Sequence, residues 1–300
     1  MKIGIIRTYE IDYNKGDIDD LRNAIKDSGH ETCDIYVDKI GVSIGGIGIG
    51  LEQMLDKKVP EEIDADASFL RHLGMPKDLE QFSFRLWAVK AMEEKGILVM
   101  NEVVNWLLAS DKLASYVALA KRGIPLPRTF ATEDSFAAYN AAGKMDEMVI
   151  KQMRGAMGFG VFRVGDPDFA MHVFGYLTNM NKPIYMQKYL EKKGGGDYRV
   201  VVVGGEALGA EFRKGIDWKS NVAQGASVSA AKMDDDMREM AIRSCEVLGL
   251  ECAGIDIALT EDGYKVLDVN PTFSWQGFRK ATGIDVSAHI IRHLVDRAKG

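Results

Sequence analysis

A lysine followed by a glycine-rich segment is the first feature of the sequence with chemical potential. Lys151 lies in an apolar strand pattern, and Gly155, Gly158 and Gly160 follow before a second strand pattern begins. Glycines let backbone N–H groups approach phosphates closely, and a lysine adds a point charge. The glycine order matches neither GxxxxGK[ST] nor GxGxxG. The segment fits a flap over a triphosphate, and it fits a plain turn between two strands equally well.

Two aspartates on neighbouring predicted strands form a second candidate site. A three-residue loop, Glu261–Gly263, joins the strands, and it pairs the residues directly before and after it. Counting four residues back from that pair on each strand places Asp256 opposite Asp268. Asn270 lies on the same face as Asp268, because side chains alternate along a strand. Two carboxylates and an amide oxygen suit Mg²⁺, which binds through one or two carboxylates and substrate phosphates.

The alternative for this pair is the solvated face of a sheet edge. Apolar residues surround the carboxylates, namely Ile255, Ile257, Val266 and Val269. A buried carboxylate pair without a cation would be costly, which favours the metal site.

A third group combines Asp197 with Arg213 on the following strand and with the segment Lys219–Asn221. Arginine and asparagine near a carboxylate cluster suggest that anions are handled around a bound metal. Ion pairs along a surface hairpin are the competing explanation.

The elements that must position these residues alternate between strand and helix patterns, which indicates an α/β (α+β) fold. Three units are expected: an N-terminal open α/β domain over 1–104, a central unit over 105–190 and a C-terminal mixed-sheet domain over 191–300. The glycine-isoleucine segment 41–50 is expected to be a loop. Strands are expected at 2–8, 31–37, 67–73, 97–100, 129–132, 148–152, 161–164, 184–190, 197–203, 207–213, 252–260 and 264–270. Helices are expected at 17–27, 78–95, 105–121, 134–142, 234–248 and 285–298, with another that starts near 168.

Composition excludes several classes of protein. The chain has 300 residues and a formal charge of −6, so a protein dedicated to gripping nucleic acid is not expected. No apolar stretch approaches the ~20 residues that span a bilayer, and the start lacks a signal-peptide pattern. Three cysteines without a CxxC pair read as reduced thiols. A cytoplasmic protein with no membrane partner is expected.

The order of these features resembles the ATP-grasp ligases and, within them, the RimK-like amino-acid ligases. The resemblance covers roughly residue 67 to the end and is clearest over 101–290. Six separated elements carry it in order: Ser110-Asp111-Lys112 before Gly123–Pro127, Lys151 with Gly155–Gly160, Gln187-Lys188-Tyr189-Leu190, Asp197, Lys219-Ser220-Asn221, and Asp256 with Asp268 and Asn270.

The resemblance implies ATP and Mg²⁺ (or Mn²⁺) as cofactors, and an ATP-grasp fold in which the central unit is a lid. Residues expected at the nucleotide are Lys112, Lys151, Gly155, Gly158, Gly160, Gln187, Lys188, Tyr189, Leu190, Asp197, Lys219, Ser220 and Asn221. Asp256, Asp268 and Asn270 are the expected metal ligands. Two positions depart from the family pattern, because Lys188 and Asp268 each stand where glutamate is usual.

The implied reaction is the formation of an amide through an acylphosphate. The acceptor carboxylate attacks the γ-phosphate, and the amine of an amino acid, expected to be L-glutamate, then displaces phosphate. Arg213, Asn221 and Lys219 are the expected catalytic residues, because they would steady the phosphoryl oxygens.

The expected acceptor is a small cofactor with a carboxylate tail. The pattern Gly-Phe-x-x-Ala-Thr-Gly-Ile over Gly277–Ile284 is similar to ligases that add glutamate to tetrahydromethanopterin or the deazaflavin coenzyme. The C-terminus of a protein, a carrier protein and a non-catalytic nucleotide-binding role stay open as alternatives. The aromatics Phe273, Trp275 and Phe278 fit stacking on a flat ring or packing of the last helix equally well. The resemblance also makes a homo-oligomer plausible.

Overall fold

The N-terminal strands form a parallel sheet with the strand order β2-β1-β6-β7. The computed structural model describes residues 1–9, 15–46, 48–55, 59–75, 77–153, 160–219 and 225–300. The sheet and its helices comprise β1 (Lys2–Arg7), α1 (Lys15–Asp27), β2 (Glu31–Tyr36), β6 (Ala67–Leu70), α2 (Leu79–Glu94) and β7 (Leu98–Met100). The strands and helices predicted for this part of the chain are present, with ends shifted by a few residues.

The segment 41–50 is not a loop, so that prediction was wrong. It supplies most of an antiparallel hairpin, with β3 (Ile40–Gly45) and β4 (Gly48–Gln53), and β5 (Glu61–Glu62) extends the sheet. Ile40 and Leu51 are buried in one core with residues of α2. Glycine weakens strand propensity, but the packing of Ile40 and Leu51 at the ends of the segment, with Val42 and Ile49 partly buried, outweighs that local preference.

The single helix predicted over 105–121 is two helices, α3 (Val103–Ser110) and α4 (Lys112–Lys121). Asp111 separates them with an extended backbone, and its carboxylate accepts the N–H groups of Leu113 and Ala114 at 3.0 Å. An aspartate in that position is a strong N-cap, so it starts a new helix where apolar periodicity alone predicts continuation.

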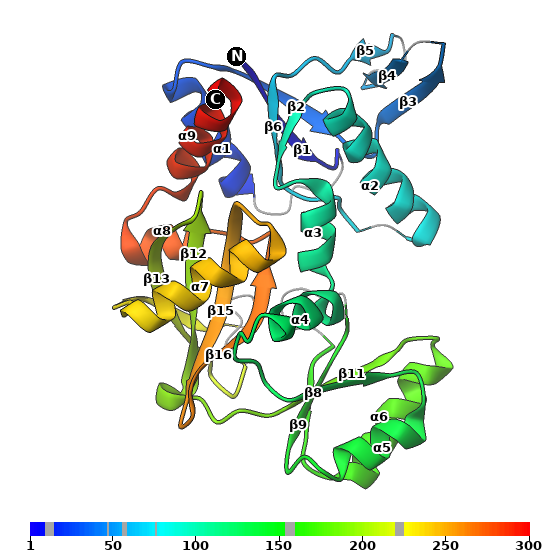
Figure 1. Ribbon diagram of the computed structural model, residues 1–300, viewed down its shortest axis with the longest axis vertical. Coiled ribbons are helices and arrows are strands. Elements are labelled where there is room, and N and C mark those ends of the chain that lie inside the picture. Colours follow the sequence, from blue (N-terminus) through cyan, green and yellow to red (C-terminus); the bar gives the residue numbers. More distant parts are fainter. Residues whose placement is uncertain (10–14, 47, 56–58, 76, 154–159, 220–224) are drawn as a thin grey trace.

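Within the predicted central unit, the part from β8 to β11 has a sheet and a core of its own, and we call this part the central unit. Its antiparallel sheet has the order β10-β9-β11-β8, and α5 and α6 contact each other beside it (Figure 1). Its core cluster contains only residues between Ala138 and Met186 as fully buried members. The elements are β8 (Thr129–Thr132), α5 (Ser135–Ala142), β9 (Met148–Lys151), β10 (Phe162–Val164), α6 (Pro167–Asn179) and β11 (Ile184–Lys188).

The C-terminal sheet has five strands in the order β14-β13-β12-β15-β16. It was predicted to be mixed, but all four of its strand pairings are antiparallel. The elements are η1 (Lys193–Gly195), β12 (Gly196–Val203), β13 (Glu206–Lys214), β14 (Ser227–Ala231), α7 (Asp235–Leu248), β15 (Cys252–Thr260), β16 (Gly263–Asn270), α8 (Gln276–Thr282) and α9 (Val286–Lys299). Neither β14 nor α8 was predicted.

The N-terminal and C-terminal parts share one continuous core. The chain returns through α9, which packs beside α1 so that both termini lie close together (Figure 1). The shared cluster joins Ile5 and Phe69 of the first sheet to Val201 of β12 and to Trp275 and Ile290 near the C-terminus. The domain bounds at 104 and 190 stay a prediction.

Asn101 joins β7 to the start of β15 with three hydrogen bonds, two of them buried and one partly buried. Its Nδ2 donates to the Cys252 carbonyl at 2.7 Å, and its Oδ1 accepts the N–H groups of Glu251 and Cys252 at 2.8 and 2.9 Å. The side chain is fully buried. A buried backbone group that loses its partner costs about 1–3 kcal/mol.

We therefore expect Asn101→Ala to lower the free energy of unfolding by about 2–4 kcal/mol in urea denaturation. Asn105→Ala is the matched control, because that asparagine makes one exposed hydrogen bond, to the Gly249 carbonyl at 3.0 Å. The control should lose under about 1 kcal/mol. Equal losses in the two variants would contradict a special role for Asn101.

Candidate active site

The candidate site lies on one face of the C-terminal sheet. Side chains alternate between the faces, and Val200 and Val202 of β12 pack against α7 and its neighbours. Asp197, Arg199 and Val201 point to the opposite face. On that face the sheet is charged towards one end and apolar towards the other, where Val201 joins the core shared with the N-terminal part.

Four charged residues lie directly across the sheet from one another on this face. Strand pairing aligns Glu211 with Arg199, Arg199 with Asp256, and Asp256 with Asp268. We call these residues the charged row. Arg213 and Asp197 form a second aligned pair beside it. The structure therefore brings the predicted metal carboxylates and the predicted catalytic arginine into one cluster.

Asp256 and Asp268 are opposite each other as predicted, but the register arises differently. Gly263 pairs with Thr260, so the turn has two residues between the paired positions instead of three. A β-bulge then shifts the register between Asp256 and Ile257, and Leu267 is the extra residue on β16. The turn is one residue shorter than predicted and the bulge adds one residue to β16, so the two changes in register cancel. Without the bulge, Asp268 would point to the other face.

Cationic side chains hold the two predicted metal carboxylates. Lys112 Nζ lies 2.5 Å from Asp268 Oδ2. Arg199 binds both oxygens of Asp256, at 2.8 and 2.9 Å, and Arg213 Nη2 lies 3.0 Å from Asp256 Oδ1. The amide nitrogen of Asn270 is 3.3 Å from Asp256 Oδ2, so the third predicted ligand also belongs to the cluster.

Asp197 pairs with the same arginine. Arg213 Nε and Nη2 lie 2.8 and 2.7 Å from Asp197 Oδ1, and Lys192 Nζ lies 3.6 Å from Oδ2. Both oxygens of this predicted nucleotide-binding acid therefore have protein partners.

Burial and charge act in opposite directions on the ionisable groups of this cluster. Burial would raise the pKa of Asp256, but Arg199 and Arg213 outweigh it and lower that pKa below its usual range. Burial would lower the pKa of Arg213, and the two aspartates beside it raise that pKa. Asp256 is therefore ionised and Arg213 charged at neutral pH.

Lys151 ends β9 in the central unit and is half-buried beside this cluster. Burial, together with the nearby charge of Lys112, lowers its pKa to about 8, although Asp268 partly offsets both effects. The backbone of the central unit meets α4 here, because the Lys112 N–H donates to the Met153 carbonyl at 3.4 Å. The structure thus brings the two predicted phosphate lysines to the same side of the carboxylates.

The segment predicted to meet adenine ends β11. Gln187 is buried, and its amide donates to Thr129 Oγ1 and the Tyr185 hydroxyl, both at 3.1 Å. The N–H groups of Lys188 and Tyr189 donate to the carbonyls of Arg128 and Glu147, at 2.8 Å each.

The side chains of Lys188 and Tyr189 in that segment both have partners on the protein surface. Lys188 turns its side chain to the surface, where Nζ lies 3.1 Å from Asp146. Tyr189 stacks under the guanidinium of Arg163, 3.7 Å from the ring centre.

Some of the predicted site residues lie beside or outside the ranges that the structure describes. Gly155, Gly158, Ser220 and Asn221 fall outside the described residues. Gly160 has a φ of +68°, and a Cβ there would meet the Gln152 amide nitrogen at 2.8 Å, so this position requires glycine. Lys219 is half-buried, with Nζ 5.3 Å from the centre of the Trp218 ring.

Sequence reasoning missed Glu211 and Tyr116. Glu211 stands two residues before Arg213 on one strand, so period-two alternation alone places both on one face. Tyr116 lies in the first part of α4, and its hydroxyl donates to the carbonyls of Leu267 and Val266 at 2.9 and 3.1 Å. Tyr116 therefore supports the bulge that orients Asp268, and no local sequence signal marks it.

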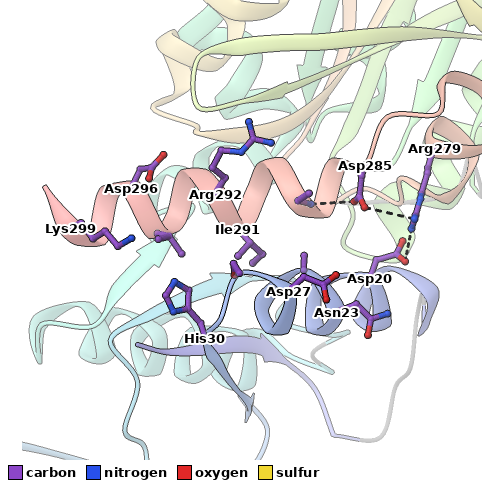
Figure 2. A pocket seen from close by; sticks show the side chains of 14 residues that line it. Asp20, Asn23, Asp27, His30, Arg279, Asp285, Ile291, Arg292, Asp296 and Lys299 are labelled. Carbon is purple, nitrogen blue, oxygen red and sulfur yellow. Dashed lines mark hydrogen bonds and ion pairs between the residues drawn. The ribbon is translucent and has the colours of Figure 1, made fainter.

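A surface pocket of about 660 Å³ lies away from this cluster, between α1 and α9 (Figure 2). Three of its charged side chains pair with one another: Arg279 lies 2.7 Å from Asp20 and 3.7 Å from Asp285. None of the predicted site residues lines it.

The described ranges contain neither a membrane-spanning helix nor a metal site built from protein side chains alone. No helix there has the length and apolar character to cross a membrane. No group of three or more His, Cys, Asp or Glu side chains there is arranged to hold a metal alone. Two carboxylates and an amide oxygen fit a hard cation that also takes ligands from a bound phosphate.

The fold and the paired charges define an ATP-grasp ligase of the carboxylate–amine class. The model of the RimK-like ATP-grasp domain matches residues 109–294, and the chain belongs to this family. A probable alpha-L-glutamate ligase of Trichodesmium erythraeum is 33% identical over 211 residues, covering 69% of this chain and 70% of that protein.

Two further relatives extend the comparison. The ribosomal protein bS6--L-glutamate ligase of Escherichia coli is 32% identical over 212 residues, covering 69% of this chain and 70% of that protein. The ATP-grasp ligase PsnB, solved with a minimal precursor, Mg and ADP, has a TM-score of 0.73 at 19% identity, covering 99% of this chain and 98% of that one. That likeness confirms the predicted fold.

The support that Tyr116 gives to the bulge is testable. We expect Tyr116→Phe to lower the free energy of unfolding by about 1 kcal/mol, because the carbonyls of Val266 and Leu267 lose the one hydroxyl hydrogen that they share. Since Asp268 follows the bulge directly, Mg²⁺-dependent nucleotide binding should weaken as well. Tyr176→Phe, at an exposed tyrosine of α6, is the control. Unchanged stability and unchanged binding in Tyr116→Phe would refute the support role.

Proposed function

We propose that the protein uses ATP and Mg²⁺ to join an α-amino acid, L-glutamate, to the carboxylate of an acceptor through an acylphosphate. The observation that carries this proposal is the pairing of Asp256 and Asp268 with Lys112, Arg199 and Arg213 on one sheet face. The names of the two glutamate-ligase relatives support the choice of amino acid.

Phosphoryl transfer depends on positioning and charge neutralisation more than on covalent chemistry by the protein. Lys112 and Lys151 approach the carboxylates from α4 and β9, where they would bind the β- and γ-phosphates. Arg213 is held between Asp197 and Asp256, so its guanidinium is fixed where the transferred phosphoryl oxygens would collect charge. Asp256, Asp268 and Asn270 would hold Mg²⁺, which supplies positive charge to the phosphates.

Charge balance indicates that metal and nucleotide bind together. Three carboxylates, of Asp197, Asp256 and Asp268, already face four cations, of Lys112, Lys192, Arg199 and Arg213. A divalent ion alone would add uncompensated charge, whereas MgATP²⁻ brings its own anionic groups. The protein should therefore bind Mg²⁺ weakly without nucleotide.

The acceptor is a carboxylate-bearing molecule, and we propose a small cofactor tail as the first candidate. The support is the Gly277–Ile284 segment, which forms α8 and the turn after it, beside the charged face. Phe278 and Trp275 are buried in the shared core, which favours packing over stacking on a ring. Relatives that act on a ribosomal protein or bind a precursor peptide favour the second candidate, a protein or peptide C-terminus.

The first test combines ATP, Mg²⁺ and glutamate with a panel of acceptors. The panel contains tetrahydromethanopterin, the deazaflavin coenzyme, a ribosomal protein tail and a carrier protein. We expect stoichiometric phosphate release and a mass gain of one glutamate residue on one acceptor, measured by mass spectrometry. Repeating the panel with the other amino acids tests the choice of glutamate.

In the same assay Asp268→Asn should lower turnover by at least about 100-fold, because one metal carboxylate is lost. Asp262→Asn, at an exposed aspartate in the turn of the same hairpin, should leave turnover unchanged. Unchanged ligation in Asp268→Asn would contradict the metal assignment.

The lowered pKa of Lys151 gives a pH test. Above pH 8 the free protein has mostly neutral Lys151, and a bound triphosphate favours its charged form. ATP binding at pH 8.5 should therefore take up a proton, and affinity should fall as pH rises further. Calorimetry in two buffers of different ionisation enthalpy measures this uptake. Lys151→Met should abolish it, and Lys182→Met, an exposed lysine, should not.

A further inference from the structure

Glu211 is the one member of the charged row for which no ion pair or side-chain hydrogen bond is recorded among the described residues. Asp268 binds Lys112, and Asp256 binds Arg199. Glu211 is 3% exposed, and its Oε2 has no hydrogen-bond partner among the described residues. A buried carboxylate oxygen without a donor is costly, so its retention calls for a ligand or a function.

Glu211 stands at the end of the row that lies away from the phosphate lysines. The order across the sheet runs from Lys112 through Asp268, Asp256 and Arg199 to Glu211. Arg199 gives its bidentate contact to Asp256, so it leaves Oε2 of Glu211 without a bond. Arg199 separates Glu211 from the two aspartates. The row therefore ends in a carboxylate on the side of Arg199 that faces away from Lys112.

A small space adjoins this oxygen. A Cβ built on Gly277, in the first turn of α8, would lie 3.8 Å from Glu211 Oε2 and 3.9 Å from Val228 Cγ2, and would meet nothing closer. The missing side chain of Gly277 thus leaves room for one methyl-sized group in contact with a carboxylate oxygen that accepts no hydrogen bond from the described residues. A cationic hydrogen-bond donor is the ligand that such a place would bind.

The proposed ligation requires such a donor. An α-amino acid carries an ammonium group at neutral pH, and this group must lose a proton before its nitrogen can attack an acylphosphate. An ammonium is repelled by the positive side chains of the site, which are Lys112, Lys151, Arg199 and Arg213. The carboxylates of Asp256 and Asp268 already form ion pairs with cations of the protein. Glu211 is the acid of the row that stays available.

We propose that Glu211 binds the ammonium of the incoming amino acid and accepts one of its protons, which makes it a further catalytic residue. The inference rests on the proposed function. The carboxylate takes a proton from the ammonium and leaves a neutral amine. The amine lone pair then forms the C–N bond as the C–O bond to phosphate breaks. The second amine proton leaves with the phosphate, and Glu211 returns its proton to solvent.

The environment of Glu211 suits a base at neutral pH. Burial raises the pKa of its carboxyl group, and Arg199 and Arg213 only partly offset that rise. A general base works best when its pKa approaches the working pH. The competing role is that of a passive counter-ion for Arg199, which would serve phosphoryl transfer and amine attack alike.

Hydroxylamine separates the two roles, because it is a neutral nucleophile at pH 7 and needs no base. With ATP, Mg²⁺ and acceptor, hydroxylamine in place of the amino acid traps the acylphosphate as a hydroxamate. We expect Glu211→Gln to keep wild-type hydroxamate formation and to lose about 100-fold or more in amide formation with the amino acid. Its remaining amide formation should rise about tenfold per pH unit as the free amine accumulates.

Two further variants sharpen the test. Glu211→Asp keeps the carboxylate and should recover part of the amide formation. Gly277→Ala fills the space beside Oε2, so it should raise KM for the amino acid with hydroxamate formation unchanged. Glu206→Gln, an exposed glutamate on the same strand, is the control and should behave as wild type.

Equal loss of hydroxamate and amide formation in a folded Glu211→Gln would overturn the inference and favour the counter-ion role. Unchanged amide formation would overturn it as well. Thermal unfolding of each variant establishes that it is folded. If the wild-type protein makes no hydroxamate with any acceptor of the panel, the proposed function fails instead, whatever Glu211 does.

Discussion

The burial of three carboxylates on one sheet face is the constraint on which the rest of the site depends. Asp197 and Asp256 are buried and Asp268 is half-buried. Breaking a buried ion pair costs about 3–5 kcal/mol, because the remaining charge loses its compensation. The cations that form ion pairs with these carboxylates lie on β12, β13 and α4. Packing of α4 on this end of the sheet therefore supplies the cation that compensates Asp268.

The opposite faces of that sheet explain how the units are joined. One face packs on α7, and the apolar end of the other joins the core of the N-terminal sheet. The central unit has its own core. It meets the C-terminal cluster through a few contacts near Lys112 and Lys151. A triphosphate bound by both lysines would therefore bridge two separately packed units.

Alternation and motif order predicted the α/β class, most elements and the cluster of Asp256, Asp268 and Arg213. Other features depend on long-range packing. The pairing of Asp256 with Asp268 was right although the loop length was wrong, because the bulge at Leu267 restores the register. That bulge is supported by Tyr116, 151 residues away in sequence. Glu211 could have been placed on the site face by alternation, but its burial depends on β14 and α8, which were not predicted.

The pairing of acids with cations connects two expectations: that Mg²⁺ binds together with the nucleotide, and that Glu211 binds a cationic group. Each acid near Lys112 has a cation of its own, so this end of the row accepts further positive charge only together with phosphate. Glu211 is the exception, and it can bind a cationic group without displacing Arg199 or Lys112. On the proposed function, this geometry would separate two cations in space: the metal would enter with the nucleotide at one end, and the ammonium would enter at the other. An amine bound at the Glu211 end would meet the acyl group on the side away from the lysines proposed to bind the phosphates.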